Sequence, residues 1–250
     1  MAAFDTNEIG RVSRQLPQPT VDGQPAVQRL GRYGGAYTEN VIPKMHTLAD
    51  EGSYFVSNNS GTGVATIAAP TSFTDTAPLW TINNTDTAQN AANKRIYLDW
   101  LRITETAAGT GGVDLRFRLV LDNTVPSGGT VLTSLNTNSD VPKSASIATT
   151  RILPVGIAQS GNSRVLVGTL IAIPTQTTPL AALSEVFLNF GGVDTMTPIY
   201  SAAASANIIK VAYGLPPIVI GAGAVLMLEF LITSQSAASS WTVEAGWWER

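Results

Sequence analysis

Short apolar runs separated by turn residues follow one another along the chain after residue 52. The runs are rich in β-branched and aromatic residues, and Gly, Pro, Asn, Asp and Ser cluster between them, which is the pattern of strands joined by turns. An all-β sandwich or jelly roll over residues 51–250 accounts for this spacing. The predicted strands are Ser53–Ser57, Val64–Ala68, Leu79–Asn83, Arg95–Glu105, Val113–Asp122, Arg151–Ile157, Arg164–Ile173, Glu185–Phe190, Ile208–Tyr213, Ile218–Ile220, Ala224–Thr233 and Trp241–Trp248.

Two of these segments carry the clearest patterns. Val113–Asp122 alternates, with four large apolar residues on one side and mostly charged residues on the other, so it predicts a strand with one wet face. Ala224–Thr233 is apolar on both sides. Such a strand is buried on both faces, and it either lies in the centre of a sheet or packs against a partner subunit.

The segments between the strands predict several connections. Ala107–Gly112 predicts a hairpin-type link between two long strands, and Gly221–Gly223 a tight turn whose glycines adopt positive φ. Ser127–Val141 and Ser234–Ser240 are expected to be polar loops or turns. Ser201–Asn207 is the one helical candidate, rich in Ala but about two turns long at most.

Residues 1–50 differ from the rest of the chain, with four prolines, little periodicity, and five basic residues balanced by five acidic ones. Apolar residues are nevertheless spread along this stretch. Two interpretations stay open: an extended arm that docks on a neighbouring surface, or a partly disordered leader. We adopt the extended N-terminal arm as the working prediction.

Charged residues make up 13% of the chain, about half the usual share. The surface must therefore consist largely of small and uncharged polar residues, which cost little free energy to desolvate when a partner covers them. We expect burial in an assembly. The net charge of −3 and the neutral arm argue against nucleic acid as a partner, and the most apolar stretch, Ile218–Ile232, is too short and interrupted for a membrane span.

Residues for catalysis are scarce. The chain has no Cys and a single His46, which lies outside any recognisable triad motif, so we expect no metal, no cofactor and no catalytic residue. A pair of carboxylates could still serve a glycosidase, and the candidates on strands are Asp99, Glu105, Glu229 and Glu244. For Glu229, within the apolar strand, we favour an ion pair with an Arg of another strand or subunit over a general acid.

Three tryptophans lie in the last ten residues. Trp241 and Trp247 share one face of the last predicted strand and Trp248 lies on the other, which implies burial on both sides. The alternatives are a carbohydrate-stacking platform, a subunit interface and simple core packing. The candidate interface residues are Trp241, Trp247 and Trp248 with Tyr33 and Tyr37 of the arm.

Two segments carry a family resemblance. The stretch LPPIVIGAGAVLMLEFL at 215–231 with WTVEAGWWER at 241–250, and RYGGAYTENVIPKMHTLADEGSYF at 32–55, resemble tailed-bacteriophage virion proteins. The resemblance covers about a third of the chain. It implies a jelly roll similar to those of trimeric decoration (cement), head-fibre or tail components, and it supplies no site residues.

These observations lead to one main expectation: a non-enzymatic capsid decoration or minor capsid protein, made in the host cytoplasm and carried in the virion. Its partners would be itself, as a homotrimer, and the major capsid or another virion protein, with the arm clamping the particle. The alternative is a receptor- or carbohydrate-binding fibre module with an exposed aromatic such as Tyr200 or Trp80. A glycan-degrading enzyme is disfavoured by the scarcity of ionisable residues.

Overall fold

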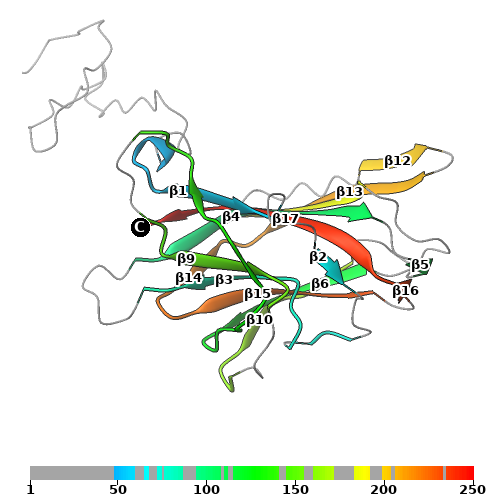
Figure 1. The fold of residues 1–250 in the computed structure, drawn as a ribbon, viewed down its shortest axis with the longest axis horizontal. Coiled ribbons are helices and arrows are strands. Elements are labelled where there is room, and N and C mark those ends of the chain that lie inside the picture. Colours follow the sequence, from blue (N-terminus) through cyan, green and yellow to red (C-terminus); the bar gives the residue numbers. More distant parts are fainter. Residues whose placement is uncertain are drawn as a thin grey trace, which may run out of the picture. The chain divides into compact units, whose positions relative to one another are not determined.

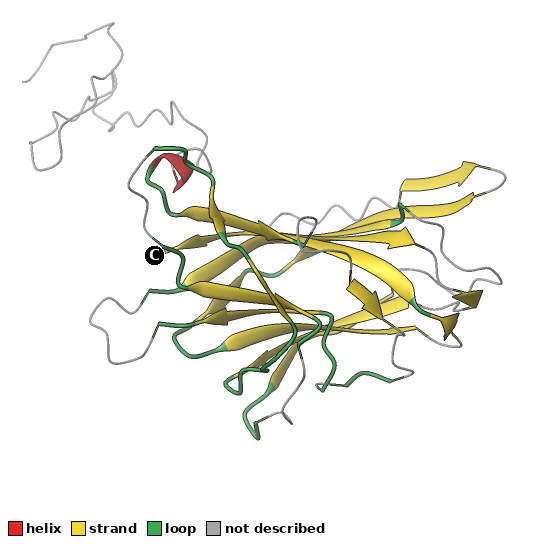
Figure 2. Ribbon diagram, in the orientation of Figure 1, coloured by secondary structure: helices red, strands yellow, loops and turns green. Residues whose placement is uncertain are grey.

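Two β-sheets pack face to face around an apolar core in this computed structural model of the chain (Figures 1 and 2). The predicted all-β sandwich is confirmed. The arm at residues 1–50 stays a prediction, because residues 1–47 lie outside the part of the chain that the structure describes. The described residues are 48–59, 65–67, 72–74, 76–86, 94–107, 110–111, 115–140, 145–154, 160–171, 183–191, 199–203, 206–232 and 235–250.

The larger sheet has nine strands and lies at the top of Figure 1. Its strand order is β12 (Ile199–Ala203), β13 (Ala206–Leu215), β11 (Glu185–Phe190), β4 (Ile96–Ala107), β17 (Ser239–Glu249), β1 (Tyr54–Asn58) and β8 (Leu135–Asn136). β14 (Ile218–Ile220) also pairs with β4, and β2 (Ala65–Ile67) also pairs with β17. β11 and β13 run parallel, whereas the other pairings among the described strands are antiparallel.

The second sheet has six strands and lies below the first in Figure 1. Its order is β10 (Arg164–Ile171), β6 (Leu115–Asp122), β15 (Val225–Ile232), β3 (Trp80–Asn84), β9 (Ala148–Ile152) and β7 (Thr130–Leu132). A small two-stranded sheet pairs β5 (Thr110–Gly111) with β16 (Gln235–Ala237). Leu48–Asp50 are helical, and the described part of the chain has no helix long and apolar enough to cross a membrane.

Strand β15 is buried on both faces, as predicted, and it lies between β6 and β3 within its sheet. Its Phe230 contacts Trp241 of the other sheet edge-to-face, with ring centroids 6.4 Å apart. On the opposite face, Val225 and Met227 pack with Val120 in a second small cluster. The prediction of one wet face for β6 is therefore only partly right, since Val120 and Asp122 are buried as well.

The predicted helix at Ser201–Asn207 is wrong. β12 and β13 form an antiparallel pair there, in which Ile199 lies opposite Lys210 and Ala203 opposite Ala206. So short a helix has a costly nucleus and few hydrogen bonds, whereas the pair extends a sheet that already exists. The predicted loop Ser127–Val141 likewise contains β7 and β8, and the predicted turn Ser234–Ser240 contains β16 and the first residues of β17.

The hairpin predicted at Ala107–Gly112 is also wrong. The two long strands that it joins, β4 and β6, lie in different sheets, so the link crosses the sandwich. The glycine turn Gly221–Gly223 also passes from one sheet to the other. Gly223 has the expected positive φ of 71°, whereas the φ of Gly221 is not positive. The strand predicted at Arg151–Ile157 is shifted: β9 ends at Ile152 because Leu153 has a left-handed φ of 47°.

Candidate functional site

The outer face of the nine-stranded sheet, which points away from the core, carries a group of aromatic side chains. Each lies next to a core residue in its strand, as strand alternation requires: Tyr54 precedes the buried Phe55, and Trp248 follows the buried Trp247. We call this surface the aromatic face. Its aromatic members are Tyr54, Tyr97, Trp100, Phe187 and Trp248.

A β-bulge in β4 places two consecutive residues on this face. Gly246 of β17 lies opposite Trp100, but the next residue of β17 lies opposite Leu98, so Asp99 is passed over in the pairing. A bulge of this kind redirects a side chain. Asp99 and Trp100 are therefore both half-buried on the outer side, while Leu98 and Leu101 point into the core.

A chain of hydrogen bonds joins three of these side chains. Trp100 Nε1 donates to Tyr54 Oη at 3.0 Å, and Tyr54 Oη donates to Asp99 Oδ2 at 2.6 Å. Burial, together with the hydrogen bond to Asp99, raises the pKa of Tyr54 well above its ordinary value. Burial also raises the pKa of Asp99, and the hydrogen bond from Tyr54 offsets part of that rise. Tyr54 therefore stays a hydrogen-bond donor at neutral pH.

Gly246 makes room for this arrangement. A Cβ at that position would lie 2.3 Å from Nε1 and 2.6 Å from Cε2 of Trp100, and 2.7 Å from Tyr54 Oη. The indole thus occupies the space that a side chain at position 246 would fill. Trp100 also lies beside Phe187, with ring planes 18° apart and centroids separated by 6.2 Å. Both rings remain partly exposed.

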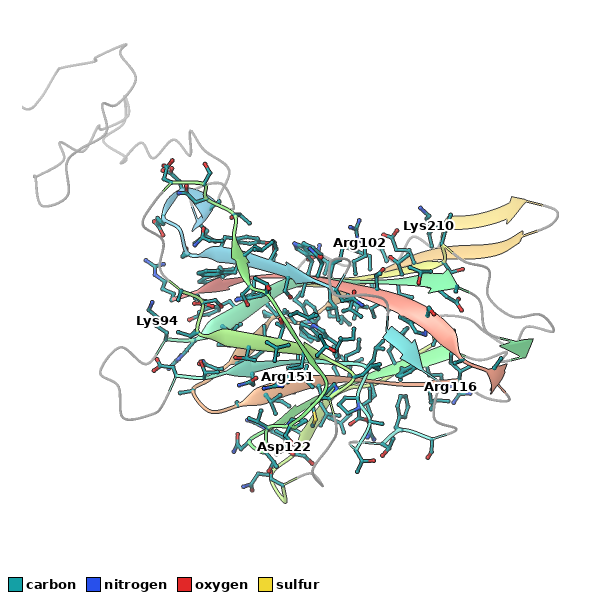
Figure 3. The ribbon with its side chains drawn as sticks, viewed as in Figure 1. Lys94, Arg102, Arg116, Asp122, Arg151 and Lys210 are labelled. Atoms are coloured by element: carbon teal, nitrogen blue, oxygen red, sulfur yellow. The ribbon has the colours of Figure 1, made fainter. Side chains whose placement is uncertain are left out.

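The other aromatic and charged side chains described here on this face form one stacked pair and two ion pairs. Tyr97 and Trp248 stack with centroids 3.8 Å apart and an interplanar angle of 4°. Arg102 of β4 pairs with Glu244 of β17, and Lys210 Nζ of β13 lies 3.9 Å from Glu185 Oε2 of β11. Figure 3 shows Arg102 and Lys210 on the side of the sheet that faces away from the core. Among the described residues of this face, the two ion pairs cancel in charge, and Asp99 adds one carboxylate.

The structure separates the predicted interface tryptophans. Trp241 and Trp247 are 1% and 0% exposed, so both lie in the core, as the core-packing alternative described. Trp248 is partly exposed on the aromatic face. Tyr33 and Tyr37 lie outside the described residues. Of the aromatics suggested for a fibre module, Trp80 is fully buried, which corrects that suggestion, and the side chain of Tyr200 is outside the described part.

The four candidate carboxylates are held in different environments. Glu229 is fully buried and is paired with Arg118 of β6, whose Nε donates to Glu229 Oε2 at 2.7 Å, so the predicted ion pair is confirmed. Glu105 is buried. Within the described ranges, no three His, Asp or Glu side chains are grouped closely enough to hold a metal ion. His46 lies outside those ranges.

The sequence argument missed most of the aromatic face. It singled out Trp248 and Asp99, but not Tyr54, Tyr97, Trp100 or Phe187. One signal was present: Asp99 and Trp100 interrupt the strict alternation of β4, and Gly246 directly precedes two tryptophans in β17. No family model matches the chain, and neither a curated protein nor a solved structure matches it.

Proposed function

We propose that this chain is a structural protein of a bacteriophage virion, a decoration or minor capsid subunit that stabilises the particle by packing against copies of itself and against a capsid protein. The family resemblance of its C-terminal and leader segments supports the virion setting. The low charge supports burial between subunits, since few ions would lose their hydration. Residues 1–50 are proposed to clamp a neighbouring subunit.

The observation that carries the proposal is the apolar character of both edges of the six-stranded sheet. Edge strand β10 exposes Val165 and Leu166 to 50% and 37%, and the opposite edge strand β7 exposes Val131 to 51%. An edge strand also presents backbone donors and acceptors that a further strand can use. Soluble monomers blunt such edges with short strands, charged residues or proline. β7 has only three residues and β10 begins with the exposed Arg164, but Val165 and Leu166 still leave an exposed apolar segment on β10 that favours coverage by a neighbour.

Native mass spectrometry and sedimentation velocity of the full-length chain test self-association. We expect a discrete oligomer, a trimer by resemblance, that Val165→Lys with Leu166→Lys weakens, because these exposed side chains are not needed by the core. Val219→Lys is the matched control, since Val219 is also exposed, at 40%, but lies on the aromatic face. A chain that stays monomeric at every accessible concentration would contradict the proposal.

The virion setting needs its own test. Antibodies raised against the purified chain should label intact particles of the phage that encodes it, and the protein should be present in those particles at many copies. Absence from purified virions would refute the virion role, even if the chain formed oligomers in solution.

A further inference from the structure

We propose that the aromatic face binds a neutral carbohydrate, with Trp100 and Phe187 as the stacking surface and Asp99 and Asn189 as the polar contacts. The inference is independent of the virion proposal, since it uses a different surface and a different ligand. It rests on the ring geometry, on polar groups that have no hydrogen-bond partner among the described residues, and on the charges of the face.

Trp100 and Phe187 form a stacked pair, and both side chains are partly exposed. Trp100 and Phe187 come from the neighbouring strands β4 and β11, and their planes lie within 18° of each other. Gly246 and Tyr54 fix the indole, through the space that the glycine leaves and through the Nε1 hydrogen bond. A sugar ring has one face made mainly of C–H groups, which suits the electron-rich face of an aromatic ring.

Polar groups lie next to these rings. Asp99 Oδ2 accepts the hydrogen bond from Tyr54, while Asp99 Oδ1 has no hydrogen bond with another described residue. Asn189 lies directly opposite Trp100 in the pairing of β11 with β4, is exposed, and makes no side-chain hydrogen bond within the described ranges. A carboxylate oxygen accepts from a hydroxyl, and an amide both donates and accepts, which matches the hydroxyl groups of a sugar.

The charge balance decides between ligand classes. Arg102 is paired with Glu244 and Lys210 with Glu185, so both cations of this face already have carboxylate partners. Nucleic acids and acidic glycans need cations that can contact phosphate or carboxylate groups. A peptide that binds by adding a strand would need the backbone groups of a sheet edge, whereas β4 and β11 are internal strands. A neutral polyol with an apolar side fits what remains.

The experiment applies the full-length chain to a printed array of neutral and acidic glycans, followed by calorimetric titration with the neutral glycan that gives the strongest signal. We expect Trp100→Ala to weaken binding about tenfold or more, because it removes the larger of the two rings on which the sugar would stack. Asn189→Ala should weaken it several-fold without changing thermal stability, because this side chain is exposed. Asn162→Ala, at an exposed turn residue before β10 of the other sheet, should bind like the parent.

Several results would overturn the inference. They are an array without any neutral glycan bound, binding that Asn189→Ala and Phe187→Ala both leave unchanged, or binding restricted to acidic glycans and lost in salt. If Trp100→Ala unfolds the protein, Asn189→Ala and Asp99→Asn still decide the question. Self-association that Phe187→Ala abolishes, with no glycan bound, would instead identify a second copy of the chain as the occupant.

Discussion

Replacing Gly246 by alanine tests the packing of the aromatic face most directly. The added Cβ would meet Nε1 and Cε2 of Trp100 at 2.3 and 2.6 Å and Tyr54 Oη at 2.7 Å, closer than real Cβ atoms approach their neighbours. Either the indole must move away, which breaks its hydrogen bond to Tyr54, or β17 must shift against β1. Gly221→Ala is the matched control, because a Cβ there meets nothing within 4 Å.

The expected cost of Gly246→Ala follows from three contributions. Overpacking costs about 1–3 kcal/mol. Loss of the Trp100–Tyr54 hydrogen bond costs about 1 kcal/mol. Because alanine has less backbone freedom than glycine in the unfolded state, the substitution also stabilises the fold by about 0.5–1 kcal/mol. The net destabilisation of about 1–3.5 kcal/mol corresponds to a fall in Tm of roughly 2–14 °C for a domain of this size.

Thermal unfolding followed by circular dichroism measures this change, and a double-mutant cycle with Trp100→Ala identifies its cause. If the clash with the indole is responsible, Gly246→Ala should cost much less in the Trp100→Ala background than in the parent. Gly221→Ala should be neutral or slightly stabilising. The reasoning would be refuted by a Gly246→Ala variant as stable as the parent, or by costs that simply add.

Two further side chains support the sandwich through hydrogen bonds. Asn59 is fully buried just after β1, where its Nδ2 donates to a carbonyl of β17 and its Oδ1 accepts from Val243 N at 2.7 Å. Asn59→Ala should therefore lower the free energy of unfolding in urea by about 2–4 kcal/mol. Asn162→Ala, at an exposed position, should leave it unchanged. For Asp122, burial would raise the pKa, but hydrogen bonds from Ser160 and from the next two backbone N–H groups outweigh it and lower the pKa. This contribution to stability is full above the unfolded carboxyl pKa and is lost as the pH falls through the lower folded pKa, so Asp122→Asn should lower the Tm clearly at pH 7 and little in strong acid.

Local pattern was sufficient for strands whose residues alternate or are continuously apolar. β11 and β14 begin and end at the predicted residues, and β15 has the predicted burial on both faces. The pairing partners of each strand could not be predicted in this way. A glycine-rich link such as Ala107–Gly112 allows a hairpin or a crossing between sheets equally well, and the choice depends on contacts far away in the sequence.

The same limit explains why most of the aromatic face was missed. Trp100 reaches the outer side only because Asp99 is bulged against β17, and the bulge depends on the register of two strands whose paired residues are far apart in the chain. Ser201–Asn207 illustrates the converse case, in which helix propensity was overridden by pairing with β13. For Trp100 the deciding interaction is a long-range pairing. For Ser201–Asn207 it is a local hairpin, which gains from joining a sheet because β13 also pairs with β11.

Asp99 gives the last prediction, and its sign is opposite to that of Asp122. Burial raises the pKa of Asp99, and the hydrogen bond from Tyr54 only partly compensates. A carboxyl whose pKa is raised on folding stabilises the fold most below its unfolded pKa, and this contribution falls as the pH rises through the folded pKa. Asp99→Asn keeps an acceptor for Tyr54 without the charge. It should therefore raise the Tm at pH 7 and leave it nearly unchanged in strong acid.

Thermal unfolding of Asp99→Asn across this pH range, with Asp122→Asn measured alongside, checks the sign. A lower Tm for Asp99→Asn at neutral pH would show that its ionised form is stabilised by the fold, contrary to the burial argument. If the variant is instead more stable and also loses glycan binding, the Asp99 carboxylate lowers stability but is required for binding. A partly buried charge that costs stability is typical of functional positions, because selection retains such a group for what it binds.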